Sequence, residues 1–390
     1  MVENTSPLAL YIEQVNNYEP MSPPSHPKVT VYPPSPPSNL IFNSLHSAPN
    51  LVKGQTNRVL AYVGSFNPPH RGHLHLLKHV FTRGTHDMNV VAAIVIPMTD
   101  EGVSAKVQAE DGNFMFGIEE RCLLWKQDPR LPPWAWVYEN GFRAFTIFSE
   151  RLIQESKKDG YQLEFVPLCG AGDASPSSTP RPRFGCKTTI ISDAARAADY
   201  QLSSGRLENF DEYTRWKRVH VDKDKLRCCA DRKVRHALEV TKDMGSQEAR
   251  SMPEDGPCHV NSDLATTLAK QIEDMKAVLE CQNLVEDRGL TLRFVECEDV
   301  DPRADHNDIS STELREVMRT NSGVELKKAL DRMALSARLL WRCRASWMEK
   351  ARLGTGLCIK FQGLTEKHLL PEESTSDEEP ASCENPPSLE

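Results

Sequence analysis

Short apolar runs alternate with amphipathic stretches through the middle of the chain. The apolar runs that predict strands are residues 58–63 (RVLAYV), 89–98 (NVVAAIVIPM), 161–170 (YQLEFVPLCG), 187–192 (KTTIIS) and 290–297 (LTLRFVEC). Helical spacing appears in residues 73–84 (HLHLLKHVFTRG), which end in Gly84, and in residues 263–280 (DLATTLAKQIEDMKAVLE). This alternation predicts an α/β fold with a doubly wound, mostly parallel sheet that helices cover on both faces.

The two ends of the chain differ in composition from the middle. Residues 1–55 hold ten of the 27 prolines, so we expect a disordered, polyproline-rich extension, with a docking segment for a protein partner as the alternative. Residues 363–390 predict an acidic disordered tail. The folded domain then spans residues 56–362, and its charged stretch at residues 222–262 is interpreted as an insertion or a mobile loop.

Composition argues against several classes of protein. The net charge is −8, but residues 371–390 carry seven acidic and no basic side chains, so the charge gives no general case for a nucleic-acid partner. No apolar run reaches the roughly 18 residues of a membrane span, and the N-terminus lacks the pattern of a secretory signal. The eleven cysteines form no C-x-x-C pair, so we expect reduced thiols, a cytoplasmic or nuclear protein and no metal site.

Polar residues follow each predicted strand. The sequences are GSFNPPH after residue 63, TD after Met98, GAGD after residue 169, DAAR after residue 192 and a loop ending in NDISSTELREVM after the last strand. Since parallel strands end at one edge of a sheet, we expect these residues to lie together in a crevice for a ligand.

The first of these loops has the features of a phosphate site. Gly64 allows the backbone to turn close to a ligand, and two prolines stiffen the loop before a helix that begins near Gly72. The first turn of that helix carries His70 and His73, which are suited to donate hydrogen bonds to phosphate oxygens. The histidines at positions 75 and 79 are interpreted as surface or packing residues.

A second motif, ISSTELR, begins another helix near the C-terminal end of the domain. Ser310 and Glu313 have the spacing of a capping box, which by itself predicts a well-capped helix. Ser311, Thr312 and the backbone amides are also able to hold phosphates, and Arg315 lies one turn further on.

The two motifs together resemble the nucleotidylyltransferase superfamily, which carries H-x-G-H near its start and I-S-S-T-x-x-R near its end. The string GSFNPPHRGH is most similar to the nicotinamide-mononucleotide adenylyltransferases, and LCGAGD is similar to their middle loop. The resemblance covers roughly residues 58–345 with gaps. It implies a Rossmann-like domain that transfers the adenylyl group of ATP to nicotinamide or nicotinate mononucleotide, with Mg²⁺ carried on the ATP phosphates.

The resemblance also implies roles for particular residues. His70, His73 and Arg315 would be catalytic. The ATP site would consist of Gly64, Ser65, Phe66, His70, His73, Gly170, Asp173, Ser310, Ser311, Thr312 and Arg315. The acceptor side would include Lys106, Trp134, whose ring would stack on the pyridine, and Arg196, with no metal ligands. The alternative for Trp134 is that it anchors a proline-rich loop on the core.

Three segments depart from the family pattern. The middle motif is one residue longer than L-C-G-A-D, residues 174–186 are rich in Ser and Pro, and residues 222–262 have no counterpart that we identify. Two alternatives therefore stay open. One is nucleotidyl transfer to another phosphorylated acceptor, and the other is a nucleotide-binding regulatory protein or weak ATPase on the same fold.

Overall fold

The structure is a computed structural model, and it describes residues 5–17, 41–42, 49–109, 115–180, 183–224, 226–227, 229–230, 258–285, 289–297, 309–342 and 344. Side chains of residues 258–263 are outside this description. The strands of the described residues form one eight-stranded sheet and a separate antiparallel pair. No helix among these residues is long and apolar enough to cross a membrane.

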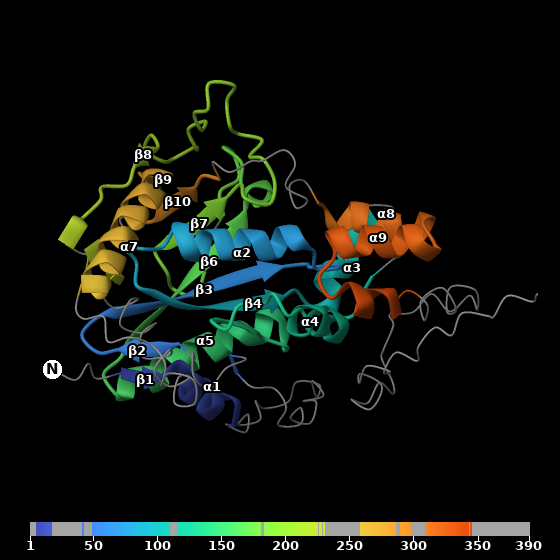
Figure 1. Cartoon of the computed structure of the whole chain (residues 1–390), viewed down its shortest axis with the longest axis horizontal. Helices are drawn as coiled ribbons and strands as arrows, with labels where there is room; N and C mark the ends of the chain where they lie inside the picture. The colour runs from blue at the N-terminus through green and yellow to red at the C-terminus, as the bar shows by residue number, and fades with distance from the viewer. Residues whose placement is uncertain are drawn as a thin grey trace, which may run out of the picture.

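The large sheet confirms the predicted α/β fold (Figure 1). Its strands lie in the order β5 (Ala135–Val137), β4 (Val90–Pro97), β3 (Thr56–Gly64), β6 (Gln162–Gly170), β7 (Thr188–Ser192), β10 (Thr291–Val295), β9 (Val278–Gln282) and β8 (Lys217–Arg218). The first six are parallel to one another, whereas β9 runs antiparallel to both of its neighbours. All five predicted strands are present, as β3, β4, β6, β7 and β10.

The chain changes direction across the sheet between β3 and β6. From β3 it moves outward to β4 and β5, then returns to pair β6 on the other side of β3 and continues to β7. In doubly wound sheets this reversal opens a binding region outside the carboxyl ends of the two central strands. The topology therefore favours the loops that follow Gly64 and Gly170 as the candidate binding region.

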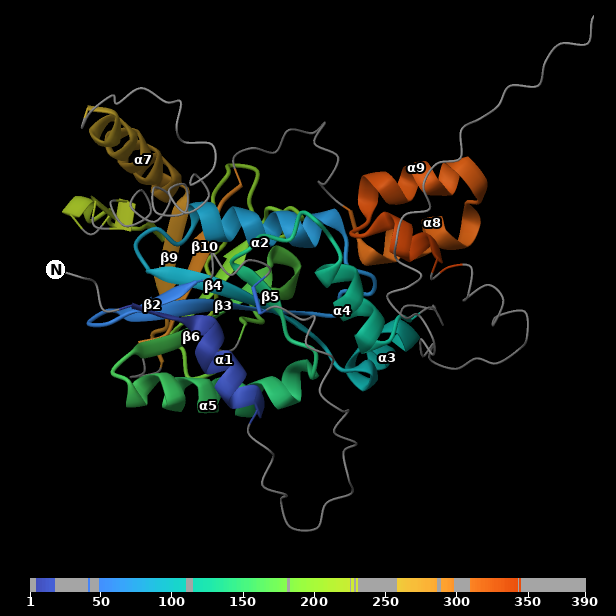
Figure 2. The same cartoon turned by 60° about the horizontal axis from the view of Figure 1, so that its bottom comes forward.

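Helices cover both faces of the sheet, as Figures 1 and 2 show from two directions. On one face lie α2 (Arg71–Arg83) and α7 (Cys258–Lys276), and on the other lie α5 (Gly141–Lys158) and α1 (Leu8–Asn17). Their inward stripes are apolar: Leu74, Leu77 and Val80 of α2 are buried, and so are Phe145 and Leu152 of α5. The sheet is thus buried on both faces, which explains the continuous apolar runs of β3 and β4.

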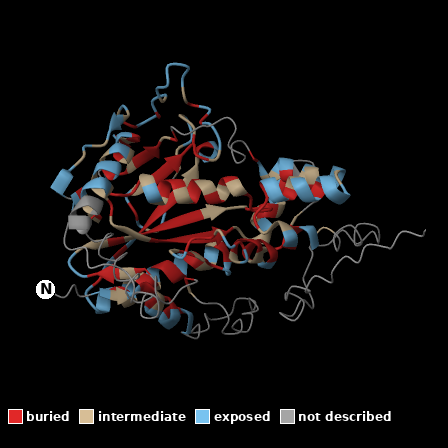
Figure 3. Cartoon of the chain, viewed as in Figure 1, coloured by how far each residue is buried: buried red, intermediate tan, exposed pale blue. Residues whose placement is uncertain are grey.

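A smaller helical group lies beyond the carboxyl ends of β3 and β4 (Figure 1). It comprises α3 (Asp100–Ala109), α4 (Ile118–Lys126), α8 (Ser311–Thr320) and α9 (Gly323–Met333). Leu124 of α4 packs with Leu314 of α8 and Leu326 of α9 in a core of their own, while the outer faces of α8 and α9 are exposed (Figure 3). This packing holds the second motif next to the first.

The predicted helix at residues 263–280 is wrong at its C-terminal end. The helix ends at Lys276, and residues 278–282 form β9, which pairs with β10. Val278 is buried, so an apolar position that suggested a further helical turn instead packs in the sheet core. Local periodicity cannot separate these two outcomes in so short a run.

Some residues that precede the predicted boundary at residue 55 pack on the folded body. β1 (Thr5–Pro7) pairs with β2 (Asn50–Val52), and Leu8 and Ile12 of α1 are fully buried. These side chains pack with α5 in the core on the second face of the sheet. The rest of the predicted N-terminal extension, residues 18–40 and 43–48, lies outside the described residues.

Other predictions on the flanking segments fall largely outside the described residues. The acidic tail at 363–390 and the boundary at 362 lie wholly outside them. Within the expected insertion at 222–262, Leu226 and Ala230 are buried in the described part, so this part belongs to the core. In the Ser- and Pro-rich stretch at 174–186, of which residues 174–180 and 183–186 are described, Phe184 packs against Phe145 on the second face.

Candidate active site

The two motifs that are far apart in sequence are in direct contact. Arg315 Nη1 donates to the backbone oxygen of Asn67 at 2.7 Å, and Ser311 Oγ donates to that of Pro68 at 2.9 Å. These contacts join positions 248 and 243 residues apart along the chain. Arg315 Nη2 also donates to Thr312 Oγ1 at 3.1 Å, which orders the guanidinium. The predicted meeting of the first loop and the last motif is therefore present at the carboxyl edge of the sheet.

Ser310 has the capping role that its spacing predicts. It precedes α8, and its hydroxyl oxygen accepts a hydrogen bond from the backbone N–H of Glu313 at 3.0 Å. The side chain of Ser310 is thus engaged in holding the helix start. This cap aims the first turn of α8, with Ser311 and Thr312, toward the loop after β3.

The loop after β3 folds back on itself around Phe66. Phe66 has a left-handed backbone with φ of 47°, and its ring is 2% exposed. A Cβ at Gly64 would lie 2.6 Å from this ring, so only glycine fits there. The ring of Phe66 packs edge-on against Trp125 and against His73. The ring of Phe66 therefore lies in the core beneath the loop, and a nucleotide lined by this residue would meet its backbone.

His70 and His73 form a pair at the amino end of α2. Their ring centroids are 3.6 Å apart, and the backbone N–H of His70 donates to His73 Nδ1 at 3.2 Å. Because this bond requires the lone pair on Nδ1, the proton of a neutral His73 ring is on Nε2. His70 Nδ1 is buried and has no hydrogen-bond partner among the described residues. A neutral imidazole N–H and an unsatisfied nitrogen are therefore both present where the ligand was predicted.

Burial keeps both rings neutral. Desolvation lowers the pKa of His70 to about 3, and desolvation, His70 and Lys106 together hold the pKa of His73 well below its usual range. At neutral pH the pair therefore offers hydrogen bonds without positive charge.

Lys106 supplies positive charge next to this pair. It lies on α3, is exposed, and is close enough to His73 to depress the pKa of that ring. Lys106 therefore lies near the first motif. Its placement beside the first motif suits a phosphate contact.

The buried Arg121 was missed by the sequence reasoning. Its side chain is fully buried on α4, where it donates to the backbone oxygens of Phe116, Ser65 and Met98 at 2.7–3.0 Å and to Asp100 Oδ1 at 2.8 Å. The guanidinium therefore connects the loop after β3 with the loop after β4. The sequence did carry one signal for this role, because Arg121 begins the otherwise apolar run RCLLW. An arginine buried with such a run needs several hydrogen-bond acceptors around its guanidinium.

The loop after β6 faces this site from the other central strand. Gly170 is the last residue of β6, and its N–H donates to Asp173 Oδ2 at 3.2 Å across the turn η1 (Ala171–Asp173). A Cβ at Gly172 would lie 3.6 Å from Arg196 Nη1, so the exposed guanidinium of Arg196 borders this turn. Gly170, Asp173 and Arg196 are therefore grouped as predicted.

A buried carboxylate, Asp193, follows β7. It is 8% exposed, and burial raises its pKa to about 6. Its Oδ1 accepts a hydrogen bond from the backbone N–H of Cys297 at 2.8 Å, so it links the ends of β7 and β10. The sequence placed Asp193 after a strand but gave no reason to distinguish it from other polar residues there.

Trp134 is not brought to this site. Its ring stacks on Phe81 at a centroid distance of 3.6 Å, and its backbone oxygen accepts from Ala93 in the middle of β4. Phe81 lies eight positions after His73, which is about 12 Å along the helix axis. The prediction of Trp134 as a pyridine-stacking residue is wrong, and its alternative role as a core anchor fits the structure.

Comparison with known proteins supports the superfamily. Residues 61–134 match the family described as Cytidylyltransferase-like, and this segment includes the loop after β3, helix α2 and the loop after β4. No curated protein matches the chain. The family match and the meeting of both motifs at the switch point support a nucleotidyltransferase-type protein that binds nucleotide substrates.

Proposed function

We propose that this protein transfers the adenylyl group of ATP to nicotinamide or nicotinate mononucleotide, which yields NAD or deamido-NAD and pyrophosphate. The observation that carries the proposal is the junction of Arg315 and Ser311 with the backbone of Asn67 and Pro68. This junction places the amino ends of α2 and α8 side by side. Both ends present N–H groups and positive dipole ends, which suit a triphosphate.

The chemistry needs positioning and charge stabilisation rather than a strong base. An oxygen of the acceptor phosphate, already an anion, attacks the α-phosphorus in line. The new P–O bond forms as the bond to the β-phosphate bridging oxygen breaks, and pyrophosphate takes the electron pair. Arg315 and Lys106 are the cations placed to bind phosphate oxygens during this transfer.

His73 has a specific part in this proposal. Because Nδ1 accepts from the backbone N–H of His70, the Nε2–H is the group that His73 offers to a phosphate oxygen. A neutral donor at 2.7–3.1 Å from a developing anion is of the kind whose removal costs about 10²–10³-fold in turnover. His70 supplies the second ring of the pair.

Mg²⁺ belongs to the substrate here, since ATP enters as its magnesium complex. The ion neutralises part of the triphosphate charge. The edge of the sheet carries the cations Arg315 and Lys106 as well as the carboxylate of Asp173, a combination that fits a metal-bearing triphosphate.

The pyridine mononucleotide is favoured by sequence similarity. The string GSFNPPHRGH and the loop LCGAGD are what point to this acceptor, and Arg196 beside Gly172 is the cation available for the acceptor phosphate. Trp134 is no part of the proposed pocket.

The placement of Trp134 also favours a second candidate function. Without that ring to stack on a pyridine, the same ATP site suits a nucleotide-binding regulatory protein or a weak ATPase. The two candidates share the phosphate contacts and differ in whether an acceptor is adenylylated.

Product analysis separates the candidates. The purified full chain is mixed with ATP, Mg²⁺ and a panel of phosphorylated acceptors that includes both pyridine mononucleotides, and products are identified by mass. We expect a dinucleotide with stoichiometric pyrophosphate, and turnover at least about 100-fold lower for His73→Ala.

Matched variants complete this experiment. Exposed His220→Ala is the control for His73→Ala, and Arg319→Ala, one turn along α8 on the exposed surface, is the control for Arg315→Ala. ATP binding or release of inorganic phosphate without any adenylylated product would refute adenylyl transfer and support the second candidate. A dinucleotide with another acceptor would keep the reaction and correct the substrate.

A further inference from the structure

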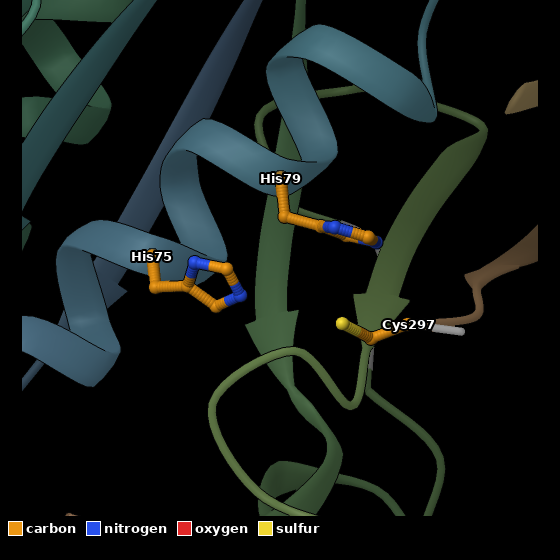
Figure 4. A group of neighbouring side chains, drawn as sticks. All are labelled: His75, His79 and Cys297. Carbon is orange, nitrogen blue, oxygen red and sulfur yellow. The ribbon is translucent and has the colours of Figure 1, made fainter. Parts of the chain in front are cut away.

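Three potential metal ligands lie together beside the candidate active site (Figure 4). His75 and His79 are four positions apart on α2, so they share one face of the helix. Cys297 follows the end of β10 and approaches the same face. One ligand atom from each of the three residues lies within 4.8 Å of the others. The tertiary structure thus brings together two histidines that the sequence indicated as surface or packing residues and a cysteine expected to be a reduced thiol.

The chemical nature of the three ligand atoms favours a particular class of metal ion. Two imidazole nitrogens and one thiolate sulfur are typical ligands of Zn²⁺, with bonds of about 2.0–2.1 Å and 2.3 Å respectively. In a tetrahedral site such bonds separate the ligand atoms by roughly 3.3–3.7 Å. In the structure the three ligand atoms all lie within 4.8 Å of one another, so a bound ion would draw them closer.

A backbone contact orients one of the imidazoles. His79 Nε2 lies 3.2 Å from the backbone oxygen of Glu296. A carbonyl oxygen only accepts hydrogen bonds, so Nε2 carries the proton and Nδ1 carries the lone pair. Histidine ligands in metal sites commonly donate their other N–H to a carbonyl or carboxylate in this manner.

The backbone of the cysteine is held as well. The N–H of Cys297 donates to Asp193 Oδ1 at 2.8 Å, which fixes the segment that carries the thiol. Cys297 is 5% exposed and His79 is 6% exposed, whereas His75 is half-buried. The group is therefore closed on the side of the core and accessible on the side of His75.

We propose that His75, His79 and Cys297 bind a divalent ion of the zinc class, with loss of the thiol proton as the Cys297 sulfur–metal bond forms. Within the described residues three ligands are available, which leaves a fourth tetrahedral position for a water molecule or another oxygen donor. The ion ties α2 to the segment after β10. It thereby fixes the helix whose first turn carries His70 and His73.

Binding of Co²⁺ tests the site directly, because a cobalt–thiolate bond gives a charge-transfer absorption band that imidazole ligands alone do not give. The metal-free full chain is titrated with Co²⁺ and then with competing Zn²⁺. We expect one high-affinity ion per chain, a thiolate band that Zn²⁺ abolishes, and loss of that band in Cys297→Ser.

Because Cys297 is buried, the Cys297→Ser protein could fold poorly for reasons unrelated to metal binding. A second variant at a more accessible ligand therefore completes the test. His75→Gln changes a half-buried ligand on the helix surface, and we expect its Co²⁺ affinity to fall at least about tenfold while circular dichroism stays unchanged. Cys281→Ser, at a buried thiol elsewhere in the sheet, is the control and should keep the band.

Binding of the ion by another thiol of the chain is an outcome that would contradict the proposal. The adjacent Cys258 and His259 are an alternative ligand pair in the sequence, so Cys258→Ser is measured in parallel. Absence of a thiolate band in the unaltered chain would refute the proposal. A band that persists in Cys297→Ser, or an affinity unchanged in His75→Gln, would also refute it.

Discussion

His70 and His73 show how burial changes the chemistry of a residue. In the sequence they are two histidines at a helix start, and protonated rings would be the simplest partners for phosphate. In the structure His70 is 4% exposed and stacks against His73, so desolvation lowers the pKa of His70 to about 3. At neutral pH the pair therefore offers N–H donors without positive charge, and Arg315 and Lys106 are cations nearby.

This burial predicts a pH-dependent stability. The folded pKa of His70 is lowered, so its contribution to stability is present above the unfolded pKa of about 6.5 and is lost as the pH falls toward about 3. One such group gives a slope of about 1.4 kcal/mol per pH unit between pH 6 and pH 4. We expect the His70→Gln protein to lose this contribution. Its free energy of unfolding should therefore change less steeply with pH, by about 1.4 kcal/mol per pH unit in this range.

Urea denaturation at a series of pH values measures the effect. Exposed His220→Gln is the control and should leave the slope unchanged. A slope for His70→Gln equal to that of the unaltered protein would mean that His70 is not buried in its neutral form.

The sequence explains Gly84 as a residue that ends a helix, but the structure gives another reason for a glycine at this position. It follows α2 and was expected to end the helix, yet its φ is −93°, a conformation open to any residue. What requires glycine is space, since a Cβ there would lie 2.3 Å from Val295 Cγ2. The close approach of α2 to β10 therefore depends on this position.

A double-mutant cycle tests the packing of Gly84 on Val295. Gly84→Ala should lower the free energy of unfolding by about 1–3 kcal/mol, because overpacking forces the helix away from the strand. In the Val295→Ala background the same change should cost less than about 1 kcal/mol, since the clashing methyl groups are gone. Equal costs in both backgrounds would contradict this explanation.

At the scale of elements, the loops of the candidate site are held by a helix that lies outside the two motifs. Helix α4 carries Arg121, whose buried guanidinium bonds the backbone of Ser65, Met98 and Phe116 and the side chain of Asp100. The spacing between the loops after β3 and β4 is thus set by one cation. Lysine has a single ammonium head and cannot bridge the same set of acceptors.

We therefore expect Arg121→Lys to destabilise the protein by about 3 kcal/mol and to weaken ATP binding. Lys126→Gln on the same helix is the control, because its ion pair with Glu139 is at the surface and should cost less than about 1 kcal/mol. Denaturation and ATP titration are measured on both variants. An Arg121→Lys protein of unchanged stability and affinity would show that the guanidinium does not position the loops.

At the scale of the whole molecule, the N-terminal residues are part of the second face of the sheet. Leu8 and Ile12 of α1 are fully buried with α5, although residues 1–55 have the composition of an extension. The high proline content of residues 1–55 as a whole gave no indication of the short amphipathic helix α1 within them. Its stability comes from packing on the sheet rather than from its own length.

Two substitutions on α1 test this packing. Ile12→Ala should lower the free energy of unfolding by about 2–5 kcal/mol, because it leaves a cavity against α5. Leu10→Ala, at a position 49% exposed on the same helix, should change it by less than about 0.5 kcal/mol. Similar small effects for both would mean that α1 does not belong to the cooperative unit.

The sequence by itself determined the strand pattern and the two motifs at the starts of α2 and α8. Strands such as β3 and helices such as α2 were predictable because apolar periodicity is a local property of the chain. The polarity of the loops predicted which edge of the sheet would carry a binding site. The cap of Ser310 was equally local, since it depends on residues three apart.

The tertiary structure alone decided which distant residues meet and how far each is desolvated. The contact of Arg315 with Asn67, the removal of Trp134 from the site and the approach of Cys297 to His79 all depend on strand order and helix packing. The neutral state of the histidine pair depends on the same packing. These properties arise from non-local contacts and burial, which no local pattern of residues encodes.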